Sequence, residues 1–320
     1  PNVIGLTTPM ASAFLLCAQS VSSSTCSSTP KKFGCGITNA AKSSLANSSS
    51  VVGKVLTQDP RVAKFSFTGS TEVGKILLAQ CATTVKKTSM ELGGNAPFIV
   101  FDDADLDEAV KGIMRSKYRN AGQTCVCTNR VYVQSGVQDA LAKKLVDAVS
   151  QLKIGAGDEE AVDIGPLINM DAVESVSDLV QDAIDNGAKL LIGGGRHERG
   201  ELFFQPTVLS HVAGSMRVAK EEIFGPIAPL ISFESEDEVL AMANDTDVGL
   251  AAYMYTRDIG RVWRVSEALE YGMVGINEGI ISNEMAPFGG VKQSGMGREG
   301  SKYGMDDYLE IKYLCMGGLT

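Results

Sequence analysis

The sequence predicts an α/β fold with a parallel sheet, and two patterns lead to that prediction. The segment 62–67 alternates in the manner of a strand, and a glycine turn and a stretch with helical spacing from Ser70 follow it. The same succession of strand and helix recurs as far as Asn277, as in proteins that build parallel sheets from βα units. Residues 1–50 are serine-rich without a sustained period, so we expect irregular structure there.

Each later element has its own signal. A helix is predicted over 105–118, where Leu106, Ala109, Val110 and Ile113 share one face. Apolar spacing predicts further helices, at 70–83, 137–152, 171–186, 235–244 and 258–269. Short apolar or alternating runs predict strands, at 86–92, 97–101, 130–134, 189–194, 203–210, 226–233, 250–256, 272–277 and 308–316.

Composition excludes several classes of protein. A chain of 320 residues with 44% hydrophobic content can bury a sizeable core and suggests about two domains. Its 29 basic and 38 acidic residues give a net charge of −9 without a basic run, so nucleic acid is not an expected partner. No stretch approaches the roughly 18 to 20 apolar residues of a membrane span, and the N-terminus lacks the charged n-region of a signal peptide. We expect an intracellular protein, with mitochondrion and cytoplasm both open.

The cysteines and histidines limit the possible chemistry. Seven cysteines without a repeating framework argue for reduced thiols and against a disulfide-stapled fold. Only His197 and His211 are present, both in polar contexts, which removes most mechanisms that depend on histidine. Cys125 and Cys127 form a C-x-C pair, but soft metals usually need more ligands, so no metal is expected.

Cys125 is the candidate nucleophile. It lies in a turn containing glycine and threonine directly after a predicted helix, beside backbone N–H groups that can stabilise a thiolate. The alternative for any single cysteine is a small buried hydrophobe. What distinguishes Cys125 is its surrounding string RNAGQTCVCTNR, together with MELGGNAPFIVFDDADLD, whose Glu91 lies 34 positions upstream (125 − 91).

These two segments, with FTGSTEVG at 67–74, EEIFGP at 221–226 and PFGGVKQSGMGREG at 287–300, resemble the aldehyde dehydrogenase superfamily. YRNAGQTCVCTNR, NEGIISNEMAPFGG and REGSKYGMDDYLE are most similar to succinate-semialdehyde dehydrogenases. The resemblance covers residues 52–320, while residues 1–51 match poorly. The N-terminal part of the family sequence, including its Trp-Asn-Phe and Lys-Pro-Ala-Glu segments, has no counterpart here.

The resemblance implies a truncated Rossmann-type NAD(P)-binding domain over 1–91 and an α/β catalytic domain over 92–288. It places the return to the cofactor domain, and a C-terminal oligomerisation strand, in 289–320. It also implies a homo-dimer or homo-tetramer. GMGREG at 295–300 fits G-x-G-x-x-G, but polar residues precede it where a dinucleotide fingerprint needs a buried strand, so we do not interpret it as one.

The resemblance further implies a reaction. Cys125 would attack an aldehyde, hydride transfer to NAD or NADP would leave a thioester, and Glu91 would act as the base for its hydrolysis. Cofactor binding would fall to four residues by their match to the family motifs, which are Gly69, Ser70, Glu222 and Phe224. The oxidation of succinate semialdehyde to succinate is the specific expectation.

Two residues match the family's contacts to the carboxylate of the substrate. Arg119, six positions before Cys125, would pair with that carboxylate, and Ser282 would help to hold it. A solvated cation near a helix C-terminus is the alternative for Arg119. Cys127 resembles the partner of a redox switch, in which a disulfide to Cys125 blocks attack.

Two other functions remain open on the sequence alone. One is a catalytically silent truncated subunit or interaction module of the same fold, suggested by the unusual first fifty residues. The other keeps the thiol chemistry without a cofactor, with Cys125 and Glu91 hydrolysing activated esters through the same acyl-enzyme.

Overall fold

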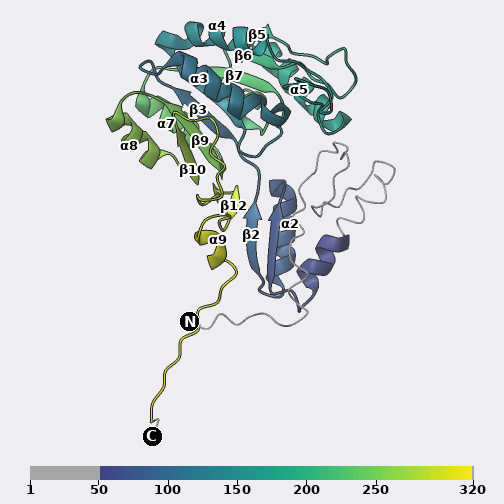
Figure 1. Ribbon diagram of the computed structural model, residues 1–320, viewed down its shortest axis with the longest axis vertical. Helices are drawn as coiled ribbons and strands as arrows, with labels where there is room; N and C mark the ends of the chain where they lie inside the picture. The colour runs from purple at the N-terminus through teal and green to yellow at the C-terminus, as the bar shows by residue number, and fades with distance from the viewer. Residues whose placement is uncertain (1–50, 319–320) are drawn as a thin grey trace.

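The computed structural model describes residues 51–318, so the expectation for the first fifty residues lies outside the described part of the chain. The described residues form a three-stranded sheet, a seven-stranded sheet and a separate two-stranded pair. In Figure 1 the seven-stranded sheet and its helices form one body, and the three-stranded sheet with α2 lies below it. The predicted α/β fold is confirmed, because helices and largely parallel strands alternate along the chain.

The three-stranded sheet brings distant segments together. Strands β1 (Lys64–Thr68) and β2 (Lys87–Glu91) are parallel and are joined by α2 (Thr71–Ala82). On the other side of β2 lies β12 (Gly295–Met296), antiparallel, so that Gly295 pairs with Glu91. The end of β2 is therefore covered by a segment about two hundred residues away in the sequence. A helix over residues 51–58 precedes β1.

The seven-stranded sheet has the order β10-β9-β3-β4-β7-β6-β5, and only β5 is antiparallel to its neighbour. The interior strand β3, which lies between β9 and β4, is buried at every residue, as continuous apolar runs covered on both faces are. The strands are β3 (Ala96–Val100), β4 (Thr128–Gln134), β5 (Lys189–Ile192), β6 (Thr207–Ser210), β7 (Ile227–Phe233), β9 (Ala251–Tyr255) and β10 (Met273–Ile276). The sequence predicted all seven. It did not predict the short pair β8 (Val248–Gly249) and β11 (Val291–Lys292).

Helices cover this sheet, with α3 against α4 and α7 against α8 (Figure 1). Their bounds are α3 (Leu106–Ile113), α4 (Gln138–Val149), α5 (Met170–Asp185), α6 (Arg217–Lys220), α7 (Glu236–Asn244) and α8 (Ile259–Ala268). The short helix α9 (Tyr303–Asp306) lies below this body, next to β12 (Figure 1). Asp105 begins α3 by accepting hydrogen bonds from the N–H groups of Asp107 and Glu108. Such a cap satisfies donors that the helix itself leaves unpaired, which explains why the helix starts there.

The predicted helix over 105–118 changes its geometry before it ends. After Ile113 it continues as a π-helix, Met114–Tyr118, and then as a 3₁₀ turn, Arg119–Gly122. Within that turn Asn120 and Ala121 both have φ of 54°, and Gly122 has φ of 75°. Left-handed backbone is costly for residues with a Cβ and often accompanies functional sites. These residues turn the chain toward Cys125.

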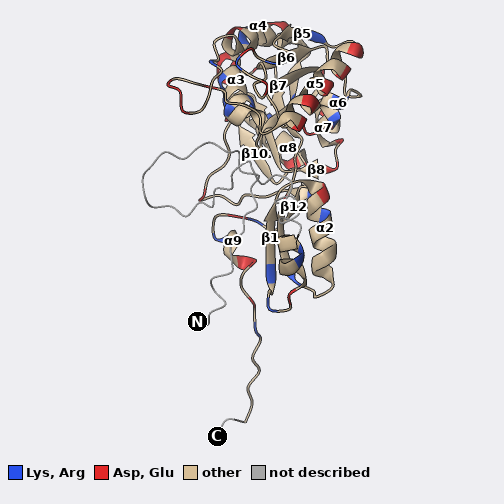
Figure 2. Ribbon diagram, turned by 90° about the vertical axis from the view of Figure 1, so that its right-hand side faces the viewer, with Lys and Arg blue, Asp and Glu red and all other residues tan. Residues whose placement is uncertain are grey.

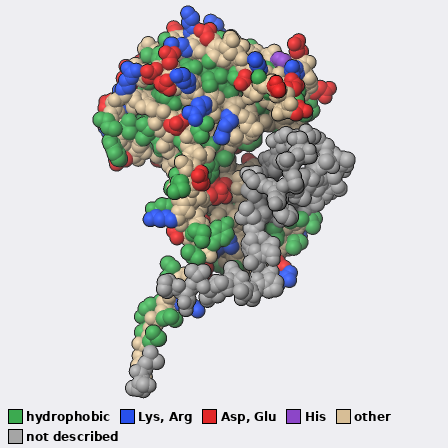
Figure 3. All heavy atoms as spheres, in the orientation of Figure 1, with side chains coloured by type: hydrophobic (Ala, Val, Ile, Leu, Met, Phe, Trp, Pro, Cys, Tyr) green, Lys and Arg blue, Asp and Glu red, His purple; other side chains and the backbone are tan. Residues whose placement is uncertain are grey.

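One predicted strand is wrong. Residues 309–318 form no strand, and the tail leaves the body of the molecule (Figures 1 and 3). Exposed apolar side chains alternate along it, including those of Leu309, Ile311 and Tyr313. The alternation is typical of a strand, but a strand forms only where a neighbouring edge pairs with its backbone groups. Within residues 51–318 no strand pairs with this segment.

Two further observations concern the distribution of charge and the length of the helices. Basic and acidic side chains are interspersed over the helices in Figure 2. Among the described helices, none combines the length and the apolar character needed to cross a bilayer.

The buried interior strand β3 provides a test of how the core is packed. Ile99 is fully buried on β3, whereas Ile259 at the start of α8 is 70% exposed. We expect Ile99→Ala to lower the free energy of unfolding by about 2–5 kcal/mol, because it leaves a cavity. Ile259→Ala should change it by less than about 0.5 kcal/mol. Urea unfolding followed by circular dichroism measures both, and equal losses would contradict this packing.

Candidate active site

Cys125 lies in a tight turn between the 3₁₀ segment and β4. The turn is closed by a hydrogen bond from the N–H of Cys127 to the carbonyl of Thr124, at 3.0 Å. The backbone N–H groups of Cys125 and Val126 both point toward the Cys125 thiol and favour its ionised form. Tyr253, buried on β9, donates its hydroxyl to the carbonyl of Val126 at 2.7 Å and thereby fixes the turn.

Burial nevertheless raises the pKa of Cys125 to about 11, and the carboxylates of Glu222 and Glu91 add to the rise. The half-buried thiol is therefore protonated at neutral pH. A thiol in that state needs a base to become a nucleophile. Both carboxylates lie within electrostatic range of it.

Glu91 ends β2 and is 4% exposed. Its Oε2 atom is buried without a hydrogen-bond partner among the described residues. Burial raises the pKa of Glu91 to about 8, with a further rise from Glu299 and an opposing effect from Arg298. A carboxylate whose pKa lies near neutral pH suits general base work.

Gly93 and Gly94 lie against the residues that carry the thiol of Cys125 and the carboxylate of Glu222. A Cβ on Gly94 would lie 2.8 Å from the carbonyl oxygen of Cys125, and a Cβ on Gly93 would lie 2.6 Å from Oε2 of Glu222. A side chain at Gly94 would displace the backbone of Cys125, and a side chain at Gly93 would displace the carboxylate of Glu222. The Gly93–Gly94 pair therefore permits the close approach of backbone on which the site depends.

Glu222 and the N-terminus of α2 meet on the other side of these glycines. The N–H of Gly94 donates to Oε1 of Glu222 at 3.2 Å. Ser70 caps α2 by accepting from the N–H of Val73, and Thr71 Oγ1 approaches the Gly93 position. Although Glu222 is reached by solvent, the surrounding protein raises its pKa to about 7 by desolvation.

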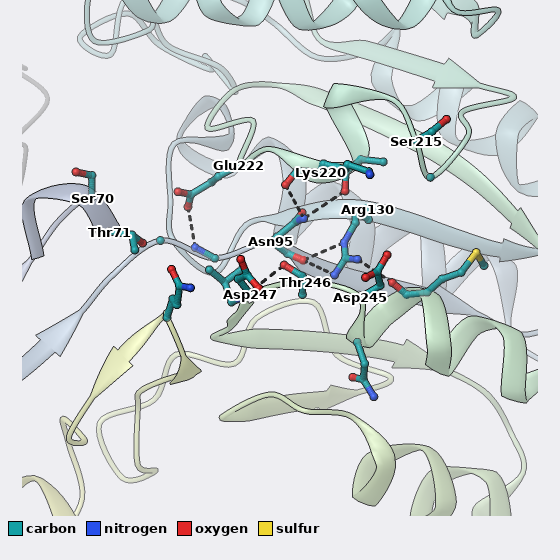
Figure 4. Close-up of a pocket in the computed structure, with 18 of the residues that line it drawn as sticks. Ser70, Thr71, Asn95, Arg130, Ser215, Lys220, Glu222, Asp245, Thr246 and Asp247 are labelled. Carbon is teal, nitrogen blue, oxygen red and sulfur yellow. Dashed lines mark hydrogen bonds between the residues drawn. The ribbon is translucent and has the colours of Figure 1, made fainter. Parts of the chain in front are cut away.

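These residues line a pocket of about 950 Å³. Figure 4 shows Ser70, Thr71 and Glu222 at one side of it and Asp245, Thr246 and Asp247 at the other. Neither Cys125 nor Glu91 lines this pocket, so it adjoins the thiol without containing it. Among the described residues, no cluster of His, Cys, Asp and Glu could hold a metal ion.

The other predicted site residues Arg119, Ser282 and Phe224 are exposed. Arg119 is exposed, within electrostatic range of Cys127, and Ser282 is exposed in the loop after β10. No described contact joins Ser282 to Arg119 or to Cys125. Phe224 is 38% exposed, has φ of 47° and does not line the pocket.

Cys127 is buried and turned away from solvent. Its Sγ accepts a hydrogen bond from Nζ of Lys117 at 3.5 Å, and Lys117 is itself fully buried. Burial raises the pKa of the Cys127 thiol, while Lys117 lowers it. Cys81, Cys125, Cys127 and Cys315 are all free thiols in the described part of the chain.

Comparison with known proteins agrees with this geometry. The profile described as the aldehyde dehydrogenase family matches residues 35–314. The chain belongs to the aldehyde dehydrogenase family. The match begins upstream of residue 52, where the motif resemblance begins, and so includes residues that the motifs did not reach.

Relatives within the aldehyde dehydrogenase family are close. The chain is 62% identical over 284 residues to a 3-sulfolactaldehyde dehydrogenase of Pseudomonas putida, covering 89% of this chain and 58% of that protein. It is 62% identical over 273 residues to a succinate-semialdehyde dehydrogenase [NADP(+)] of Escherichia coli K12, covering 85% and 57%. A crystal structure of succinate-semialdehyde dehydrogenase from Burkholderia pseudomallei matches with 64% identity and a TM-score of 0.83, covering 83% and 55%. The chain spans little more than half the length of these relatives.

The residues around the pocket suit one part of a nicotinamide cofactor. A side chain at Gly93 would collide with Oε2 of Glu222, whereas glycine leaves that oxygen in place. The Glu222 carboxylate can then accept hydrogen bonds from hydroxyl groups such as those of a ribose. The N-terminus of α2, beginning after Ser70, offers backbone N–H groups and a positive dipole end to phosphate. Both features face the same pocket.

Sequence reasoning missed four buried polar residues beside this site: Asn95, Lys117, Asn129 and Arg130. Arg130 donates from Nε and Nη2 to the carbonyl of Asn95, and from Nη1 and Nη2 to the carbonyls of Met242 and Ala243 near the end of α7. Buried polar residues are normally fully bonded and conspicuous in sequence. The adjacent Asn129 and Arg130 at the start of an apolar strand were the available signal.

The unpartnered carboxylate of Glu91 predicts a pH-dependent stability. Because its folded-state pKa is raised to about 8, the folded state loses stability as pH rises from about 4.5 to 8. Glu91→Gln removes this ionisation, so the variant should gain about 1–3 kcal/mol relative to the parent at pH 9 compared with pH 6. Urea unfolding at the two pH values measures the gain. A difference independent of pH would show that Glu91 is not desolvated.

Proposed function

We propose that the site oxidises a short aldehyde with an anionic group at its other end to the acid, specifically succinate semialdehyde to succinate. The observation that carries the proposal is the half-buried Cys125 thiol with its two inward N–H groups, in electrostatic range of the buried, unpartnered Glu91. This arrangement suits covalent catalysis by a thiol and a carboxylate base.

Cys125 has the role of nucleophile. Glu91, with its pKa of about 8, accepts the thiol proton, and the thiolate then attacks the aldehyde carbon to form a thiohemiacetal. The N–H groups of Cys125 and Val126 lie where they donate to negative charge on sulfur, and the same turn offers a donor to the oxyanion. NAD or NADP, when bound, supplies the acceptor for the hydride.

Glu91 has a second role once the acyl group is on Cys125. A carboxylate without a hydrogen-bond partner is free to accept a proton from water, and its desolvation makes it a stronger base than an exposed glutamate. Water activated in this way hydrolyses the thioester and frees the acid. Glu222, with Gly69 and Ser70 at the start of α2, would hold the cofactor, and Phe224 would contact its nicotinamide side.

Arg119 and Ser282 hold the anionic end of the substrate. Two relatives are named for aldehydes that carry a carboxylate or a sulfonate, and an arginine pairs with either group. The exposed Arg119 directly follows the π-helix and lies six residues before Cys125. Both residues therefore belong to the segment that connects this helix to β4. The support for succinate semialdehyde in particular is the motif resemblance of this region.

The proposed function is tested on the purified chain with succinate semialdehyde and either NAD or NADP, by absorbance of the reduced cofactor. We expect turnover that rises with pH through about 8 as Glu91 ionises, and that Cys125→Ala abolishes. Glu91→Gln should lower kcat by about 10²- to 10⁴-fold. It should also accumulate an acyl-enzyme that mass spectrometry detects on Cys125.

A folded protein that neither turns over nor forms an adduct at Cys125 would contradict the proposal and would favour a silent subunit. Turnover of an activated ester without NAD or NADP, in the absence of aldehyde oxidation, would instead favour thiol hydrolysis alone.

The role of Arg119 makes a separate prediction. Arg119→Gln should raise KM for succinate semialdehyde by about 10- to 100-fold, the value of a charged hydrogen bond, and leave KM for the neutral butanal unchanged. Arg115, one turn earlier and paired with Glu278, offers a matched control. If Arg115→Gln and Arg119→Gln affect both aldehydes alike, Arg119 is only a solvated cation.

We further propose that Cys127 acts as a redox switch with Cys125. Hydrogen peroxide would take two hydrogens from the two thiols to give a disulfide and two molecules of water. Because Cys127 is buried against Lys117, it must leave that contact to react. Peroxide should inactivate the protein and dithiothreitol restore it, while Cys127→Ala should show no reversible inactivation. Equal reversible inactivation of the variant would exclude this partner.

A further inference from the structure

Glu222 lies in a segment that regular structure does not hold. The segment follows α6 and precedes β7, and residues 221–226 belong to no helix or strand. On either side of Glu222, backbone groups of this segment are instead bonded by one side chain. Asn129 donates from Nδ2 to the carbonyl of Glu221 at 2.8 Å, and its Oδ1 accepts from the N–H of Ile223 at 3.1 Å. The amide of Asn129 thus spans Glu222 by bonding the residues on both sides of it.

Asn129 is fixed in this position from behind. It is the second residue of β4 and only 2% exposed. Its remaining Nδ2 hydrogen bonds to Oδ1 of Asn95 at 2.9 Å. Both N–H donors and the oxygen of the side chain are therefore used, which leaves it a single orientation. Asn95 in turn donates to the carbonyls of Ala219 and Lys220, at 3.2 and 3.3 Å, so the end of α6 is held as well (Figure 4).

The same pair of asparagines connects the backbone of Glu222 to its carboxylate. Asn95 follows Gly94, whose N–H bonds to Oε1 of Glu222, and Arg130 binds the carbonyl of Asn95 through two nitrogens. Gly122 on the approach to Cys125 packs directly against the carbonyl of Gly225. The turn that carries the thiol and the segment that carries Glu222 therefore share one rigid support.

We propose that Asn129 is a positioning residue that fixes the direction of the Glu222 carboxylate in the pocket, and through it the affinity for the cofactor. The link to the cofactor rests on the proposed function. Asn129 does not itself line the pocket, so it acts only through Glu222. Without its amide, the N–H of Ile223 and the carbonyl of Glu221 lose their partner, and the segment can rotate Glu222 away from Gly94.

The test uses the full chain and the variants Asn129→Ala and Asn129→Asp. The aspartate keeps the shape and the acceptor for Ile223 but loses both donors. Ser210→Ala serves as a matched control, because it also removes a buried polar group from a strand, on β6 and away from this network. Hydrogen exchange measured by mass spectrometry follows the segment 219–226, and steady-state kinetics with NADP or NAD separate KM from kcat.

We expect slow exchange at Ile223 in the parent protein, although its segment is irregular, and about tenfold faster exchange over 219–226 in Asn129→Ala. The increase should be smaller in Asn129→Asp, which keeps the acceptor for the N–H of Ile223. KM for the cofactor should rise by about tenfold, with kcat changed by less than about threefold. The control should change neither quantity.

Fast exchange at Ile223 in the parent protein would overturn the proposal without any variant, which keeps the test valid if the variants do not fold. Unchanged exchange in folded variants would overturn it as well. If the variants speed exchange but the parent protein neither binds cofactor nor turns over, the positioning of Glu222 by Asn129 stands and the proposed function fails.

Discussion

The close approach of backbone at Gly93 and Gly94 is the constraint on which the rest of the site depends. These two residues lie in the connection between β2, which ends in Glu91, and β3 in the interior of the large sheet. Side chains at either position would collide with the carbonyl of Cys125 or with the carboxylate of Glu222. At Gly94 the neighbour is backbone, which cannot move aside cheaply, whereas at Gly93 it is the carboxylate end of the Glu222 side chain. Two glycines therefore bring one thiol and two carboxylates within electrostatic range of each other.

That proximity has an electrostatic consequence. Each of the three groups is desolvated, and Glu222 and Glu91 both disfavour ionisation of Cys125, so the pKa values rise to about 7, 8 and 11 respectively. Cys125 has the highest pKa because a thiol ordinarily ionises at a higher pH than a carboxylic acid, and desolvation is the largest cause of the rise in all three groups. A resting site with the thiol protonated and a carboxylate ready to take its proton is the result.

Most elements of the fold were predictable because each carries a local signal. The strands of the large sheet are short apolar runs, and helices such as α3 begin at a side-chain cap. The 308–316 prediction failed for a physical reason: alternation in a sequence such as YLEIKYLCM reports a preference, whereas a strand also requires an edge to pair with. The π-helix before Cys125 was not predicted because its five residues, MRSKY, carry no pattern that distinguishes a π-helix from the continuation of an α-helix.

The residues of the candidate site also differ in whether the sequence alone reveals them. Cys125, Glu91 and Glu222 could be proposed from the sequence because the expected chemistry requires those residue types within recognisable strings. Asn129 and Asn95 were missed because their role is to bond backbone atoms some 90 to 125 residues away, and no local pattern specifies such partners. Their burial without solvent is what makes those bonds obligatory, since each unpaired group would cost a desolvation penalty. The residues that set the geometry of the site are therefore legible only in the folded chain, whereas the groups proposed to react are legible in the sequence.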